Sequence, residues 1–114
     1  MKESVIQKKS FDFAVRTVKI VQFLQKKNEY VMSKQLLKSG TSIGANVSEA
    51  TFAQSSADFI SKMSIALKEA NETKYWIDLL VATKFVDENS VANLKTEVIE
   101  IIKILTSIVK NSKK

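Results

Sequence analysis

The sequence lacks three residue types altogether: its 114 residues include no cysteine, no proline and no histidine. Without cysteine, the chain can form neither a disulfide framework nor a thiol nucleophile. Without histidine, it lacks the commonest general base and a common ligand of transition metals. Serine and threonine are plentiful, but no histidine is present to activate them. The composition therefore predicts a protein that is not an enzyme and that uses no cofactor or metal.

The carboxylates leave one catalytic alternative open. Glu69 and Glu72 form an E-x-x-E pair, and so do Glu97 and Glu100. This spacing can hold Mg²⁺ in all-helical nucleotide hydrolases. Neither pair lies on the apolar row of its segment, and a carboxylate-metal hydrolase is therefore only a third, minor alternative.

Long hydrophobic runs are also missing from the chain. No apolar stretch approaches the roughly 20 residues that cross a bilayer. The first residues, MKESVIQKKSFDF, lack the apolar run of a signal peptide. We therefore expect a cytoplasmic protein with no membrane partner.

Basic residues outnumber acidic ones in this chain, and nearly all of the basic residues are lysines. Eighteen Lys and Arg against twelve Asp and Glu give a net charge of +6, and Arg16 is the only arginine. A basic chain favours anionic partners, with nucleic acid first. Scarcity of arginine disfavours bidentate reading of guanine, whereas lysine suits phosphate contacts that ignore sequence.

Candidate phosphate-binding residues cluster in the first half of the chain. They are Arg16, Lys19, Lys26, Lys27, Lys34 and Lys38. The alternative interpretation is an ordinary solvated face. We find no aromatic residues interleaved with these lysines, and base stacking is therefore not predicted.

Apolar residues recur at steps of three and four along most of the chain, which indicates amphipathic helices rather than strands. The spacing predicts helices over residues 10–28, 30–53, 56–84 and 88–111. Ser10 is a candidate N-cap for the first, and Ser55 with Asp58 resembles a capping box before the third. Short turns between such helices favour an all-α, antiparallel up-down four-helix bundle, here in a single domain over residues 1–114.

The same spacing predicts which residues face the core. In the second helix the inward row is Leu36, Gly40, Ile43, Val47 and Ala50, and in the first it is Phe11, Ala14, Val18 and Val21, with Phe13, Ile20 and Leu24 beside it. The inward row of the second helix keeps its spacing through Gly40, so this helix should continue through both Gly40 and Gly44. Glycine costs about 1 kcal/mol inside a helix, and close packing is the candidate compensation.

Polar residues form a further row on the second helix and another on the third. The members are Gln35, Ser42, Asn46, Glu49, Glu69, Glu72 and Trp76, which we call the polar seam. Small side chains let another helix approach closely, so we expect the seam to be partly buried by a helix of the same chain or of the next copy. A buried carboxylate needs a partner, and Arg16 or a nearby lysine is the expected counterion. A solvated flank is the alternative.

Two stretches, SFDFAVRTVKIVQFL and SKQLLKSGTSIGANVSEATFAQSSADFISKMSIALKEANETKYWIDLL, carry a resemblance that covers nearly the whole chain. They closely resemble the four-helix bundle protein family, also called the 23S rRNA intervening-sequence protein family. Many relatives have proline where this chain has Gly44, which implies a helix bend that glycine also permits.

That resemblance implies an up-down bundle that forms rings of five. It also implies a relation to the accessory proteins of diversity-generating retroelements, which have a similar pentameric bundle and bind nucleic acid. The positions that carry over are Gln35, Ser42, Asn46, Glu49 and Glu72.

The leading hypothesis is a non-enzymatic bacterial bundle that assembles as a homopentamer and binds RNA or DNA through its lysines. The alternative from another class is a structural adaptor ring that binds a protein partner. Salt-dependent binding of RNA separates the two, because an adaptor should show no lysine-sensitive salt slope.

Overall fold

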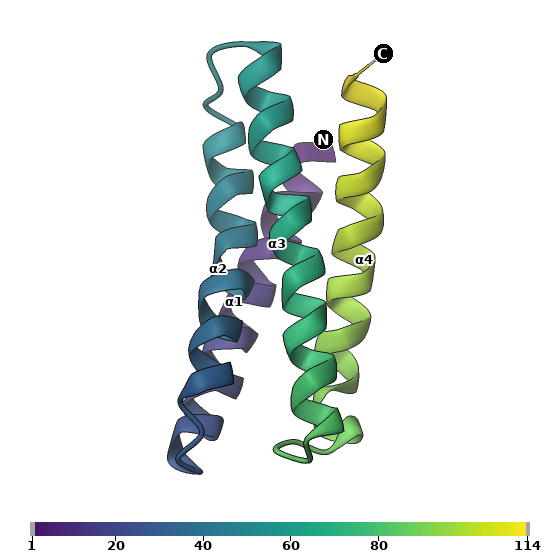
Figure 1. Cartoon of the computed structure of the whole chain (residues 1–114). Coiled ribbons are helices and arrows are strands. Elements are labelled where there is room, and N and C mark those ends of the chain that lie inside the picture. The colour runs from purple at the N-terminus through teal and green to yellow at the C-terminus, as the bar shows by residue number, and fades with distance from the viewer. Residues whose placement is uncertain (1, 114) are drawn as a thin grey trace.

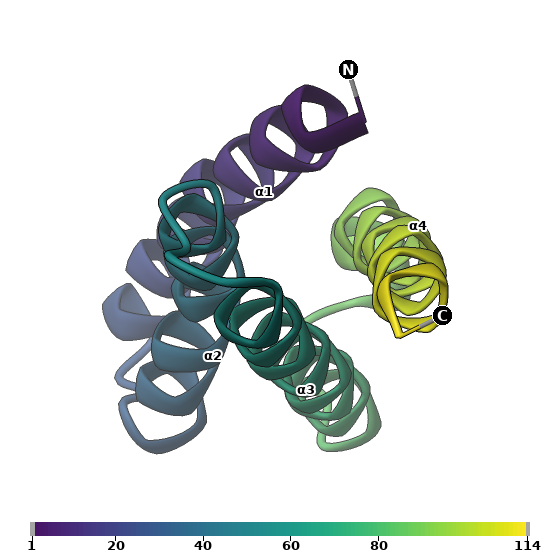
Figure 2. The same cartoon turned by 90° about the horizontal axis from the view of Figure 1, so that it is seen from above.

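The chain folds into four long helices joined by short turns. The computed structural model describes the backbone of residues 2–113 and the side chains of residues 5–113. The helices are α1 (Lys2–Lys26), α2 (Val31–Ala50), α3 (Ser56–Ala82) and α4 (Glu88–Ser112). Consecutive helices run in opposite directions (Figure 1), and around the bundle they follow their order in the chain (Figure 2). The prediction of an all-α, antiparallel up-down four-helix bundle is confirmed.

The predicted start of the first helix is wrong. Ser10 lies inside α1, where its hydroxyl donates to the carbonyl oxygen of Gln7 at 3.2 Å, so it is not an N-cap. The residues before it contain no glycine or proline, and Ile6 is fully buried in the core, which favours a helix that begins earlier. The cap of α3 is confirmed, because Ser55 Oγ accepts the backbone N–H of Asp58 at 3.0 Å.

The inward row of α2 is confirmed, whereas that of α1 is largely wrong. All five predicted α2 residues are buried. In α1 the buried row is Ile6, Ser10, Phe13, Thr17, Val21 and Leu24, while Phe11 is 68% exposed and Val18 is also exposed. Helix α1 carries apolar residues on two sides, and periodicity alone does not say which side the other helices cover.

The two glycines of α2 bring it close to α1. A Cβ atom at Gly40 would lie 2.7 Å from Cγ2 of Thr17, and one at Gly44 would lie 3.2 Å from the carbonyl oxygen of Ser10. Helix α2 continues through both positions. The close packing that the sequence predicts is therefore present, and it is made within the chain.

The turns after α1 and α3 are built alike and lie at the same end of the bundle (Figure 1). Asn28 and Lys84 adopt the left-handed conformation, with φ of 65° and 66°. In each turn the following residue donates its N–H back across the helix end, Glu29 to Leu24 at 3.0 Å and Phe85 to Leu80 at 3.0 Å. Both are Schellman C-caps, so this end of the bundle has a defined backbone.

Candidate functional site

The polar seam lies along the line where α2 meets α3. Gln35 and Glu49 are exposed, whereas the remaining five residues are half-buried: Ser42, Asn46, Glu69, Glu72 and Trp76. Ser42 Oγ donates to the carbonyl oxygen of Lys38 at 2.6 Å, and Asn46 Nδ2 donates to that of Ser42 at 2.8 Å. The hydrogen bonds of these two side chains are therefore made within α2 rather than to α3.

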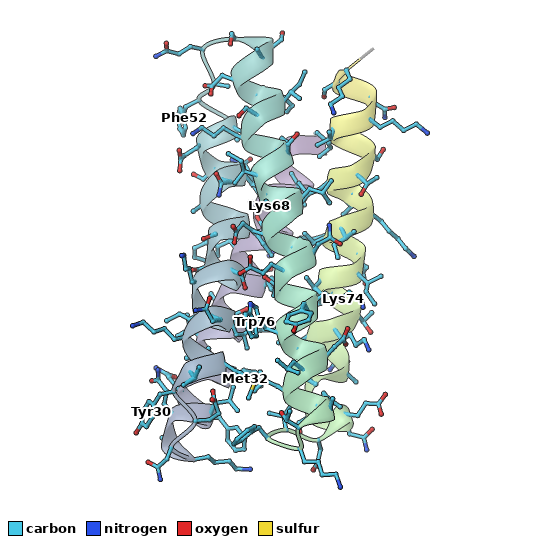
Figure 3. The ribbon with its side chains drawn as sticks, in the orientation of Figure 1. Tyr30, Met32, Phe52, Lys68, Lys74 and Trp76 are labelled. Atoms are coloured by element: carbon cyan, nitrogen blue, oxygen red, sulfur yellow. The ribbon has the colours of Figure 1, made fainter. Side chains whose placement is uncertain are left out.

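Two aromatic side chains lie at the lower end of the polar seam. The indole N–H of Trp76 donates to Glu72 Oε2 at 3.3 Å, and the ring packs edge-on against Tyr75 with centroids 5.2 Å apart. Trp76 also packs against the core, between α2 and α3 (Figure 3). Its position favours a packing role over ligand stacking.

Of the two expected counterions of the seam, Arg16 or a nearby lysine, the structure shows the lysine. A lysine does serve, because Lys62 Nζ lies 3.2 Å from Glu49 Oε1 and links α3 to α2. Arg16 does not: it forms an ion pair with Glu97 of α4. The reason is its place on α1, on the side that faces α4 rather than α2.

Glu69 is the seam carboxylate whose ionisation the fold opposes. Burial raises the pKa of its carboxyl group, and the neighbouring Glu72 carboxylate raises it further, against smaller opposing effects of Lys68 and Lys38. A raised pKa in the folded state means that the protonated form is favoured by folding. This contribution to stability is complete below the ordinary pKa and is lost as the pH rises through the raised one.

We therefore expect Glu69→Gln to raise the melting temperature at pH 7 and to change it little near pH 4. The glutamine keeps the shape of the side chain and removes the ionisation that burial opposes. Thermal melts followed by circular dichroism at both pH values test this. Equal effects at both values would show that Glu69 is not the source of the pH dependence.

Asp78 provides a control of opposite sign. Burial alone would raise the pKa of Asp78, but hydrogen bonds from Lys74 and Lys95, each at 2.9 Å, and the charges of both ammonium groups lower it overall. Its contribution to stability is present above the ordinary pKa and is lost as the pH falls through the lowered one. Asp78→Asn should therefore destabilise the protein at pH 7 and less at low pH.

The second E-x-x-E pair takes part in ion pairs between α1 and α4. Glu97 pairs with Arg16, and Glu100 Oε2 lies 3.1 Å from Lys9 Nζ.

Over the described side chains, no group of three or more potential metal ligands comes together. In the same part of the chain, no helix has the length and apolar content needed to cross a membrane.

All six candidate phosphate-binding residues are exposed on one hairpin, and five of them form the group considered next. Lys19, Lys26, Lys27, Lys34 and Lys38, which we call the lysine surface, lie in the C-terminal half of α1, the following turn and the N-terminal half of α2. Among the described side chains, none of the five forms an ion pair. The sixth candidate, Arg16, is engaged by Glu97.

Aromatic residues do lie among these lysines, contrary to the sequence-based expectation. Lys27 Nζ lies 4.6 Å above the ring centroid of Phe23, and the exposed Tyr30 stands one helical turn before Lys34. Figure 3 shows Tyr30 at the outer edge of the bundle, at the end with the α1–α2 turn. Spacings of three and four residues on a helix would have revealed both neighbours.

A groove runs between α1 and α2 on the outside of the bundle. Its volume is about 750 Å³, and its walls include Phe11 and Ala14 of α1 with Gly44 and Ala45 of α2. The groove could not be predicted from helical spacing, because that spacing placed Phe11 in the core.

Comparison with known proteins finds a solved structure with the same fold and a family model that matches this chain. A crystal structure of a protein of unknown function from the S23 ribosomal protein family of Bacteroides thetaiotaomicron VPI-5482 is 52% identical. The similarity covers 96% of this chain and 99% of that one, with a TM-score of 0.93. No curated protein matches. The model of the 23S rRNA-intervening sequence protein family matches residues 2–107, and the chain therefore belongs to that family.

Proposed function

We propose that the protein is a non-catalytic bundle that assembles with copies of itself and binds RNA or another nucleic acid through the lysine surface. The observation that carries the proposal is that those five lysines form no ion pair with any described side chain. Six other basic residues are paired with carboxylates. Five further described lysines are also unpaired, but they are spread over α3, α4 and the segments that follow these helices: Lys68, Lys84, Lys103, Lys110 and Lys113. Unpaired ammonium groups on one hairpin are available to neutralise phosphates and release their counterions.

Self-assembly is supported by the outer side of α1. Phe11, Val15 and Val18 are exposed at 68%, 41% and 37%, and they follow one another at steps of four and three. Phe11 also lines the groove against α2. A row of this kind is costly to leave in water and suits contact with a neighbouring copy. A ring of five, the assembly proposed here, would join two different surfaces of each copy around a closed axis.

Salt-dependent binding tests the nucleic-acid part. We expect a fluorescein-labelled RNA hairpin to bind with an affinity that falls steeply between roughly 50 and 200 mM salt. A variant with Lys26, Lys27 and Lys34 changed to glutamine should bind at least about tenfold more weakly. Its log–log salt slope should fall by about 0.9 for each phosphate that the variant no longer neutralises.

The matched control changes the exposed Lys68, Lys103 and Lys110 of α3 and α4 to glutamine, with the same change of charge. If both triple variants weaken binding equally, the lysine surface is no binding site. Binding that does not depend on salt would favour the protein-adaptor alternative. Light scattering tests assembly, and a monomer at micromolar concentration would contradict it.

A further inference from the structure

We propose that the α1–α2 turn is a site for unpaired nucleotides, with bases stacking on Phe23 and Tyr30 and phosphates held by Lys26, Lys27 and Lys34. The inference rests on the proposed function and narrows it, because it names the form of nucleic acid that this surface prefers.

Both rings of the proposed site are exposed to solvent. Phe23 is 45% exposed and Tyr30 is 56% exposed, and neither belongs to the buried core. Every base offers a π face, so an exposed ring beside a cationic surface binds bases regardless of sequence. Such stacking changes affinity by roughly 5- to 100-fold for each base.

The turn holds Tyr30 in a defined position. Asn28 closes α1 in the left-handed conformation, and the Tyr30 hydroxyl donates to Asn28 Oδ1 at 3.3 Å. The next helix begins directly after Tyr30. A ring that is already placed loses little conformational freedom when a base stacks on it.

Each ring has lysines one helical turn away. Lys26 and Lys27 follow Phe23 by three and four residues, and Lys27 Nζ lies 4.6 Å from the centre of its ring. Lys34 follows Tyr30 by four residues, and its backbone N–H donates to the Tyr30 carbonyl oxygen at 3.3 Å. Base and phosphate contacts therefore alternate around the turn, as they do along a single strand.

The acidic residue of the turn is directed inward. Glu29 is the one acidic residue between Asp12 and Glu49 in the sequence. It is 6% exposed, and its two carboxylate oxygens accept the backbone N–H groups of Met32, at 3.1 Å, and Ser33, at 2.7 Å. Because this carboxylate caps α2, the surface of the turn presents cations and rings to an incoming strand.

Binding of a 12-nucleotide oligouridylate and of a 12-base-pair RNA duplex, each labelled with fluorescein, tests the proposal by anisotropy. Bases inside a duplex are already stacked on one another, whereas those of the single strand are free. Phe23→Ala and Tyr30→Ala should each weaken single-strand binding about 5- to 100-fold and duplex binding less than about twofold. Tyr30→Phe keeps the ring but removes the hydroxyl that holds it to Asn28, so it should weaken single-strand binding less than Tyr30→Ala does.

Tyr75→Ala is the matched control, because Tyr75 is 58% exposed and belongs to α3 rather than to the α1–α2 hairpin. Circular dichroism confirms that each variant is folded. If Tyr30→Ala and Phe23→Ala bind like Tyr75→Ala, the stacking site is wrong, while lysine-dependent binding would still support the proposed function. If the unchanged protein binds neither RNA, the proposed function fails with it. Oligothymidylate distinguishes DNA from RNA as the source of the strand, and a Tyr30-dependent loss of affinity with either supports the site.

Discussion

Phe13→Ala is expected to lower the free energy of unfolding by about 3–5 kcal/mol, whereas Phe11→Ala should change it by less than about 1 kcal/mol. The two phenylalanines lie two residues apart in α1, yet Phe13 is 1% exposed and Phe11 is 68% exposed. Truncating Phe13 removes a ring from the centre of the bundle and leaves a cavity. Truncating Phe11 removes a ring that is exposed to water and lines the groove between α1 and α2.

Urea denaturation followed by circular dichroism measures both changes. Because a domain of this size is stabilised by about 5–15 kcal/mol, the Phe13 variant should unfold at a much lower urea concentration. The same Phe11 variant tests the proposed assembly, since removal of a ring from the proposed interface should lower the mass in light scattering. Equal destabilisation by both variants would show that the core of α1 has been assigned to the wrong face.

This pair of residues also shows where the fold could be predicted from sequence and where it could not. In α2 one side is apolar and the other polar, so spacing alone selects the buried row that ends at Ala50. In α1 apolar residues occupy two sides, so spacing is compatible with either. Only the position of α2 and α4 around α1 decides between them, and a single helix does not contain that information.

Some features of the candidate site could likewise be predicted from the sequence, whereas others could not. The lysine surface could be predicted because exposure follows from helical phase. The partner of Arg16 could not, because Glu97 lies 81 residues later in the chain and only bundle packing brings them together. The role of Glu29 as a cap was missed because it depends on the backbone of the turn, where Asn28 takes the left-handed conformation.

Gly40→Ala is expected to destabilise the protein by up to about 2 kcal/mol, although alanine is the better helix former. The new methyl group would lie 2.7 Å from Thr17 Cγ2 and 2.9 Å from Thr17 Oγ1. Thr17 is fully buried, branched at Cβ and held by a hydrogen bond to the Phe13 carbonyl oxygen at 2.9 Å. Overpacking of a core by this amount costs about 1–3 kcal/mol, and the helix propensity of alanine returns about 1 kcal/mol.

A double-mutant cycle identifies the clash as the cause. If the methyl group introduced by Gly40→Ala collides with Thr17, then Thr17→Ala should relieve the collision. The destabilisation of the double variant should then be smaller than the sum of the two single destabilisations, and the difference should be about 1 kcal/mol or more. Gly44→Ala is the control, since its Cβ would meet the Ser10 backbone at 3.2 Å rather than Thr17, and Thr17→Ala should not rescue it. Should Gly40→Ala instead stabilise the protein by about 1 kcal/mol, as at an unconstrained helix position, α1 and α2 would not be in close contact there.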